Sequence, residues 1–299
     1  MNFPLDHPWL AGAIADLPTP FDAQDNPDLA AFAKLCERQI AAGATALLVG
    51  ETMGEMPTLH IDEHATLVRT AVATARGRIK VIAGAGSNST AQATALARQA
   101  EEAGAHAVLS VVPYYNKPTQ AGILAHFRAV AAATSLPIIV HDAPSRTMRP
   151  LADDTLVQLT ESAQFIGLCD GSGDIARPIR LRGRLPRGFA LLSGHCDTAM
   201  PFLFYAGDGS ISAIAGVAPD LMNQLHGACR QQEMIYATEL MDRLAPLAAV
   251  LAQDATPASL KYALSLLQLG SPRLRLPMVE LNRAEKCAVT EAMAIALGP

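Results

Sequence analysis

Short apolar segments alternate with longer amphipathic segments along most of the chain. Eight of the short segments are rich in Ala, Val, Ile and Leu and end at polar residues or glycine, which predicts β-strands. They are Gly12–Thr19, Ala46–Glu51, Lys80–Ala85, Ala107–Pro113, Pro137–Asp142, Gln164–Asp170, Ala190–His195 and Ser210–Ala215. The segments between them, such as Ala91–Ala103 and Thr119–Ala133, carry apolar residues three and four positions apart and predict helices. Near-continuous apolar strands separated by helices indicate a parallel sheet covered on both faces.

One type of junction recurs in front of the predicted strands. Gly43, Gly104 and Gly207 each follow an alanine and precede the second, fourth and eighth strand. We expect each glycine to end a helix with a positive φ, which costs glycine little. Repeated junctions and eight successive strand–helix units favour a (βα)₈ TIM barrel over an open sheet.

Beyond Pro219 the pattern is helical only. The segments Met222–Ala252, Ala258–Leu269 and Leu281–Leu297 predict helices, and we expect Pro246 to kink or break the first of them. The expected fold is α/β, with a barrel over residues 1–219 and a C-terminal helical extension over residues 220–299 that packs on the barrel.

Composition narrows the classes of partner. Hydrophobic residues make up 50% of the 299 residues and charged residues 17%, so the chain can bury a large core. The net charge of -5 makes nucleic acids and anionic membranes poor partners. Five cysteines with no C-x-x-C pair fit a reducing compartment. With no signal sequence and no membrane-length apolar stretch, we expect a cytoplasmic protein with a small-molecule ligand.

Motifs for nucleotides and metals are weak. Gly84–Ser89 lacks the third glycine of a dinucleotide fingerprint, and no Walker A sequence exists, so we predict no cofactor. His60–His64 matches the H-x-x-E-H pattern of some zinc proteases. Asp62 and Glu63 also suit the first turn of a helix, and we favour that interpretation and expect no metal. A basic run predicts a solvated helix face and the following loop, with an anion contact as the alternative; it contains Arg177, Arg180, Arg182, Arg184 and Arg187.

Polar residues gather where the predicted strands end. In a parallel barrel the functional site lies at the C-terminal ends of the strands. Those ends carry Glu51–Glu55, Tyr114–Asn116, His141-Asp142, Cys169-Asp170 and His195-Cys196, and Arg146 follows soon after the fifth strand. Titratable and nucleophilic residues at several strand ends predict a site at this end of the barrel.

Several of these segments also carry a family resemblance. The motifs are Val49–Glu55, Pro113–Pro118, Ala143–Thr147, Leu191–Gly194 and Leu274–Met278. Through them the chain resembles the dihydrodipicolinate synthase and N-acetylneuraminate lyase family from about Gly12 to its C-terminus. The resemblance implies a (βα)₈ barrel with C-terminal helices, commonly a homotetramer built from dimers. It also implies class I lyase chemistry, in which a sixth-strand lysine forms an imine with pyruvate or another 2-oxo acid and a fifth-strand tyrosine relays protons. A G-T-T-G-E loop binds the carboxylate of the keto acid.

The chain departs from this family at the decisive positions. Cys169 stands where the imine-forming lysine belongs, and His141 stands in place of the tyrosine. In the loop, Thr52 matches the first threonine, whereas Met53 replaces the second threonine and Glu51 replaces the first glycine.

The resemblance also assigns residues that the chain retains. Tyr115 matches a tyrosine that the family takes from a neighbouring subunit, and it joins Cys169, His141 and Thr52 as a candidate catalytic residue. The candidate substrate-binding residues are Thr52, Met53, Arg146, Gly194 and Ile211.

The loss of the lysine leaves two hypotheses. An imine needs a primary amine, and none of the five lysines lies on the sixth strand. The first hypothesis is a lyase-family enzyme that acts on a 2-oxo acid or related small carboxylate without an imine. His141, Asp142 and Asp170 would be its acid–base residues. The second is a non-catalytic pseudoenzyme that senses a small acid or serves a binding partner.

Cys169 itself has three interpretations. It is a thiolate paired with the His141 imidazole, an inert filler of the barrel, or a metal ligand. The metal set would be Cys169, His141, His195, Cys196 and Asp170.

Two further expectations concern the ligand and the assembly. We expect a carboxylate at the barrel mouth, bound by the Thr52 hydroxyl, the backbone N–H groups of Thr52 and Met53, and the Arg146 guanidinium. Glu51 would oppose this if it points inward. We also expect a homo-oligomer, a dimer or tetramer, with Tyr115 near a subunit interface.

Overall fold

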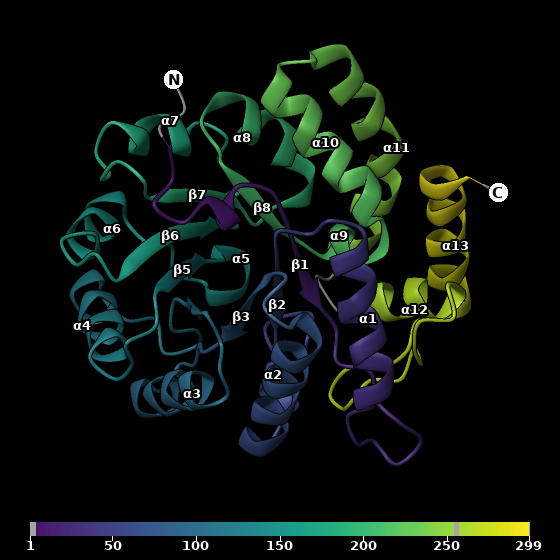
Figure 1. The fold of residues 1–299 in the computed structure, drawn as a ribbon, viewed down its shortest axis with the longest axis horizontal. Coiled ribbons are helices and arrows are strands. Elements are labelled where there is room, and N and C mark those ends of the chain that lie inside the picture. Colours follow the sequence, from purple (N-terminus) through teal and green to yellow (C-terminus); the bar gives the residue numbers. More distant parts are fainter. Residues whose placement is uncertain (1–3, 254–256, 299) are drawn as a thin grey trace.

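Eight parallel strands close into a barrel in chain order (Figure 1), as a computed structural model that describes residues 4–253 and 257–298 shows. The strands are β1 Ala13–Leu17, β2 Ala46–Val49, β3 Lys80–Gly84, β4 Ala107–Val111, β5 Ile138–Asp142, β6 Phe165–Asp170, β7 Ala190–Ser193 and β8 Gly209–Ser212. β8 pairs with β1 through Ala13 and Ser210, which closes the ring. The predicted TIM barrel is therefore confirmed.

Helices surround the barrel and extend beyond it. Those between the strands are α1 Leu29–Ala41, α2 Ile61–Ala75, α3 Thr90–Glu102, α4 Gln120–Ala131, α5 Pro144–Thr147, α6 Asp153–Leu159, α7 Arg177–Arg182 and α8 Ala199–Tyr205. After β8 come α9 Ala213–Val217, α10 Pro219–Gln231, α11 Met234–Ala252, α12 Pro257–Leu266 and α13 Arg283–Leu297. Short 3₁₀ turns occupy Pro8–Leu10, Met56–Thr58 and Cys196–Thr198.

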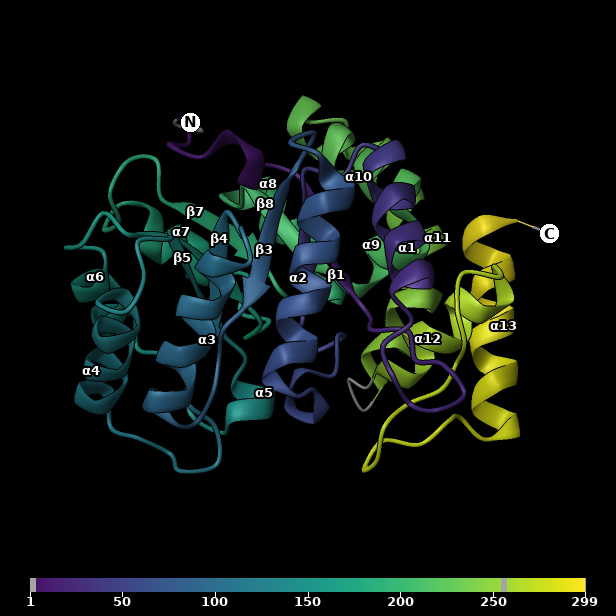
Figure 2. The same cartoon turned by 60° about the horizontal axis from the view of Figure 1, so that its bottom comes forward.

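The C-terminal helices gather on the side of the barrel that carries α1, with α13 outermost in both views (Figure 1, Figure 2). The Arg38 guanidinium on α1 donates to the carbonyl oxygens of Gly216 and Val217, at 2.7 Å each, and so ties α1 to the end of α9. No helix in the described ranges has both the length and the apolar character needed to span a bilayer.

Apolar side chains form two cores. Inside the barrel, residues such as Ile14, Leu48, Leu109 and Leu192 fill the lumen, and Trp9 packs against this cluster. A larger core lies between the strands and the helices. Alternation along the strands other than β6 separates the two sets, as the pleat of a strand requires.

The strand β6 departs from that alternation. The register between β5 and β6 shifts after Ile138, so that Ile139 lies opposite Gly167. As a result Ile166 and Cys169 both belong to the inner cluster, although they are three positions apart. The shift leaves Cys169 directly opposite His141.

Three local expectations need correction. Gly43 and Gly104 have φ of 82° and 85°, as predicted, but Gly207 does not share this conformation. Gly207 is small for another reason, because a Cβ there would lie 2.4 Å from the Phe202 ring. The segment Met222–Ala252 breaks at Gln232, with φ of 60°, while Pro246 lies inside α11 without ending it.

Candidate functional site

A cavity of about 680 Å³ opens at the C-terminal ends of the strands. It brings together residues from most of the barrel: Asp16, Glu51, Thr52, Met53, His141, Arg146, Cys169, Gly194, His195, Cys196, Ile211 and Ser212. Of the candidate catalytic and substrate-binding residues assigned from the family resemblance, all but one therefore line a single cavity.

Tyr115 is the exception. Its side chain is 89% exposed, and it lies in the loop after β4 with φ of 69°. Its neighbour Tyr114 lines a second hollow of about 430 Å³, which shares Thr52 and Arg146 with the main cavity. The single chain does not bring Tyr115 to the other candidates.

Glu51 and His141 form a buried pair across the cavity. The Glu51 Oε1 atom lies 3.1 Å from His141 Nδ1, and both side chains are about nine-tenths buried. Burial alone would raise the pKa of Glu51, but attraction to His141 and hydrogen bonds from His141 and Thr52 lower it to about 2. With a proton on Nδ1 donated to the ionised carboxylate, Nε2 is the ring nitrogen that remains for another group. This is how a carboxylate orients a general base.

Asp16 is a site residue that the sequence analysis missed. It is 6% exposed, and its Oδ2 atom accepts a hydrogen bond from the Met53 N–H at 3.3 Å. The Oδ1 atom is buried without a hydrogen-bond partner among the described residues. Burial and the charge of Glu51 raise the pKa of Asp16 well above its usual value, and the Met53 N–H and Arg146 only partly oppose this. The sequence signal was a carboxyl inside the apolar segment Gly12–Thr19, where burial of a carboxyl is costly.

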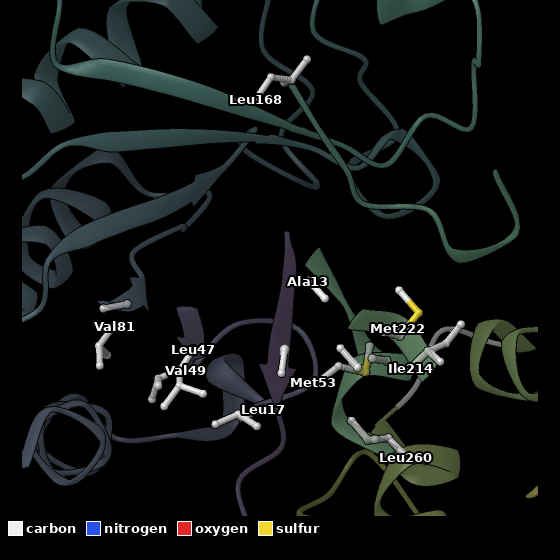
Figure 3. Close-up of a cluster of buried hydrophobic side chains, with 14 of the residues drawn as sticks. Ala13, Leu17, Leu47, Val49, Met53, Val81, Leu168, Ile214, Met222 and Leu260 are labelled. Atoms are coloured by element: carbon white, nitrogen blue, oxygen red, sulfur yellow. The ribbon is translucent and has the colours of Figure 1, made fainter. Parts of the chain in front are cut away.

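The turn after β2 uses its own carboxylates. The Thr52 N–H donates to Glu51, and the Met53 N–H donates to Asp16. A ligand carboxylate would have to displace these groups to use the same donors. The Met53 side chain is 8% exposed and belongs to the hydrophobic cluster that includes Ile214 (Figure 3). The chain's own carboxylates therefore take up the backbone donors of this turn, and the Met53 side chain is packed in the hydrophobic core.

The surroundings of Cys169 favour the inert interpretation. Its side chain is 1% exposed. Burial, and then the negative charges of Glu51, Asp170 and Asp16, raise the pKa of this thiol well above its usual value. A thiolate is therefore disfavoured at neutral pH. A Cβ at position 194 would lie 2.8 Å from the Cys169 Sγ atom, so Gly194 leaves room for the sulfur.

Asp142 and Asp170 are held by an arginine behind the cavity. Arg177 NH1 lies 2.7 Å from Asp142 and 3.2 Å from Asp170, and Nε lies 2.9 Å from Asp153. Arg177 is 4% exposed, so the expectation of a solvated face is wrong for this arginine. Asp142 and Asp170 do not line the cavity, and their carboxylates neutralise Arg177 rather than face a ligand.

The other polar candidates have structural partners. Glu63 of the H-x-x-E-H motif accepts from the His60 N–H and pairs with Arg275, as a capping residue of α2 does. In the described part of the chain, no three His, Cys, Asp or Glu side chains are placed to hold a metal ion. Lys261 is a buried amine whose pKa burial lowers to about 8, but it pairs with Glu55 and does not line the cavity.

Comparison with known proteins gives a consistent result. The sequence profile of the dihydrodipicolinate synthetase family matches residues 9–296. A 4-hydroxy-tetrahydrodipicolinate synthase of Thiobacillus denitrificans is 43% identical over 282 residues, 94% of this chain and 95% of the relative. The dihydrodipicolinate synthase of Aquifex aeolicus superposes with a TM-score of 0.92 at 35% identity, over 95% of this chain and 97% of that one. An Acinetobacter baumannii synthase, solved in complex with pyruvate, has a TM-score of 0.91 at 33% identity and covers 96% of this chain and 99% of its own.

Proposed function

Since the chain belongs to the dihydrodipicolinate synthetase family and no lysine is among the described residues that line its barrel cavity, we propose that it binds a 2-oxo acid or a related small carboxylate there without forming an imine. The observation that carries the proposal is the buried Cys169 thiol at the inward position of β6, opposite His141. A thiol adds to a carbonyl but cannot become an iminium ion. The pyruvate complex of the Acinetobacter baumannii relative supports the ligand class.

Arg146 is the group we assign to the ligand carboxylate. It is the one lysine or arginine among the described residues that line the cavity. A guanidinium matches the two oxygens of a carboxylate. Because Glu51 and Asp16 already occupy the Thr52 and Met53 N–H groups, the ligand depends on Arg146 and the Thr52 hydroxyl. We expect millimolar affinity for pyruvate, ~4 kcal/mol of binding free energy.

Calorimetry with pyruvate and larger 2-oxo acids tests this proposal. We expect Arg146→Ala to weaken binding at least tenfold, whereas Arg180→Ala, an exposed arginine on α7, leaves affinity unchanged. Equal affinity of the wild type and Arg146→Ala for these 2-oxo acids would show that Arg146 does not bind the ligand carboxylate.

Reductive trapping tests the missing imine. Incubation with pyruvate and borohydride should leave the protein mass unchanged, because a thiol gives no secondary amine. A stable adduct mapped to any lysine, Lys261 included, would overturn the proposal.

A non-catalytic binding protein is the second candidate. The observation in its favour is that Cys169 is shielded in the inner core while Asp142 and Asp170 bind Arg177. Turnover on a panel of 2-oxo acids and sugar acids separates it from an enzyme. Any turnover that depends on a cavity residue would exclude this candidate.

We also propose that the chain forms a homo-oligomer with Tyr115 near a subunit interface. The side chains of Tyr115 and Leu276 are both exposed, and aromatic residues such as Tyr115 are enriched at interfaces, which supports this proposal. Sedimentation at micromolar concentration should show a dimer or tetramer, and a 31.5 kDa species alone would contradict the proposal.

A further inference from the structure

We propose that His141, oriented by Glu51, and Asp16 together catalyse proton transfer at the carbon next to the carbonyl of the bound 2-oxo acid, so that the cavity enolises its ligand without an imine. This inference rests on the proposed function, because it needs a 2-oxo acid in the cavity. It assigns catalytic roles to His141 and Asp16 and a positioning role to Glu51.

The geometry of His141 suits a base. Its Nδ1 atom faces the Glu51 carboxylate at 3.1 Å, and its ring lines the cavity. Nε2 is then the nitrogen left for a ligand. When Nε2 takes a proton, the imidazolium lies against an ionised carboxylate that is nine-tenths buried, where the charge attraction is strong. The pair is therefore prepared for the charge that proton transfer creates.

Asp16 provides the complementary acid. It lines the cavity, and its Oδ1 atom is the second feature that points to a ligand, because this atom is buried and has no hydrogen-bond partner in the described ranges. A buried polar atom without a partner costs free energy that a bound ligand would recover. Burial and the nearby charge of Glu51 raise the pKa of Asp16, which favours the protonated carboxyl that can donate to a carbonyl oxygen. A carboxylic acid kept neutral by its surroundings is an effective oxyanion donor.

The proposed step balances without a co-reactant. The C3–H bond of the 2-oxo acid breaks, and its proton goes to His141 Nε2. The electron pair moves to the C2–C3 bond, and the carbonyl oxygen becomes an enolate oxygen that accepts a hydrogen bond from Asp16. Return of a proton from Nε2 to C3 restores the ligand. In D₂O the returning hydron is deuterium, so each cycle labels the ligand.

The test is deuterium incorporation into pyruvate, followed by loss of the methyl signal in proton NMR spectra in D₂O. Binding is measured on the same samples by saturation transfer. We expect exchange well above that of buffer alone, and a fall to the buffer rate in His141→Gln. Removal of the acid in Asp16→Ala should slow exchange about 10²-fold, whereas Asp16→Asn retains a donor and should lose less. His106→Gln, at the opposite end of the barrel before β4, is the matched control and should exchange like wild type.

Glu51→Gln separates positioning from structure. The amide can donate to Nδ1 and so favour the wrong tautomer of His141. We expect exchange to fall about 10²-fold while the affinity for pyruvate stays the same or improves.

The outcomes distinguish the two proposals. Binding with exchange that requires His141 supports both. Binding with exchange at the buffer rate overturns the enolisation and leaves the proposed function standing, and neither binding nor exchange overturns both. Deuterium exchange at the wild-type rate in a folded His141→Gln variant also overturns the enolisation.

Discussion

At the scale of single residues, burial of the Asp16 carboxyl costs free energy of folding. Its folded pKa is raised by burial and by Glu51, so the folded state binds this proton more tightly than the unfolded chain does. Such a group favours folding below its unfolded pKa of about 4, and the contribution is lost as pH rises through the folded pKa. At neutral pH the buried Asp16 carboxyl therefore lowers the free energy of unfolding.

We predict that Asp16→Asn stabilises the protein at pH 7. The gain should shrink as the pH falls and should vanish below about pH 4, where the carboxyl is protonated in the folded and the unfolded state alike. Urea unfolding at both pH values measures it. Asp154→Asn is the control, because Asp154 is 81% exposed and pairs with Arg184 at the surface. A less stable Asp16→Asn at pH 7 would show that Asp16 is ionised in the fold.

The residues of the site differ in how far the sequence predicts them. His141 and Cys169 stand at strand ends and within motifs, so their position and their departure from the family pattern were visible. Asp16 lies inside a strand, and sequence does not tell whether its side chain faces the lumen or the helices. The pairing of Glu51 with His141 joins β2 to β5, a contact 90 positions apart that local pattern does not predict.

At the scale of elements, Arg177 fastens the ends of two strands to two helices. Its guanidinium joins Asp142 of β5, Asp170 of β6 and Asp153 of α6, and it also donates to the Leu151 carbonyl at 2.7 Å. Arg177 itself begins α7. The network sets the C-terminal ends of β5 and β6, and these strands carry His141 and Cys169.

We predict that Arg177→Met destabilises the protein by about 3–5 kcal/mol, because it leaves buried carboxylates without their counter-charge. Arg180→Met on the same helix is the control. Its side chain is 49% exposed and pairs with Asp174 at the surface, so its loss should cost less than about 1 kcal/mol. Urea unfolding of the two variants makes the comparison, and equal costs would contradict a structural role for the Arg177 network.

The sequence pattern of α7 predicts the helix but does not predict which of its arginines is buried. The basic run predicts a helix with a solvated face, and Arg180 agrees, but Arg177 lies inward because acidic residues from other elements converge there. At the C-terminal side, α10 and α11 break at Gln232 and not at Pro246. A proline removes one N–H but need not end a helix that tertiary contacts support on both sides. Such contacts lie outside any local window.

At the scale of the whole molecule, repetition made the barrel predictable. Eight similar strand–helix units leave few ways to bury both faces of the sheet, and the closed order from β1 to β8 follows. The contents of the cavity are less predictable, because they combine side chains from distant strands whose inward or outward direction depends on register. The shift between β5 and β6 is one such case, since it sets Cys169 opposite His141.

Three histidines on different helices are at most 4% exposed and make the stability of the protein sensitive to acid. They are His64, His126 and His226. Burial lowers the pKa of each to about 4, and the charge of Arg230 adds to the effect at His226. In the unfolded chain their pKa is about 6.5. Between these values the unfolded state binds more protons, so stability rises with pH and is lost as pH falls from about 6.5 to 4.

We therefore expect the free energy of unfolding to fall on acidification through this window, by up to about 1.4 kcal/mol per pH unit for each histidine. Asp16 acts in the opposite direction over part of the window and reduces the total. Urea unfolding between about pH 7.5 and 4.5 measures the slope. His126→Gln should make it shallower, because it removes one of the three protonation sites. A slope that is unchanged in His126→Gln, or stability that increases on acidification, would mean that these imidazoles are not held neutral by the fold.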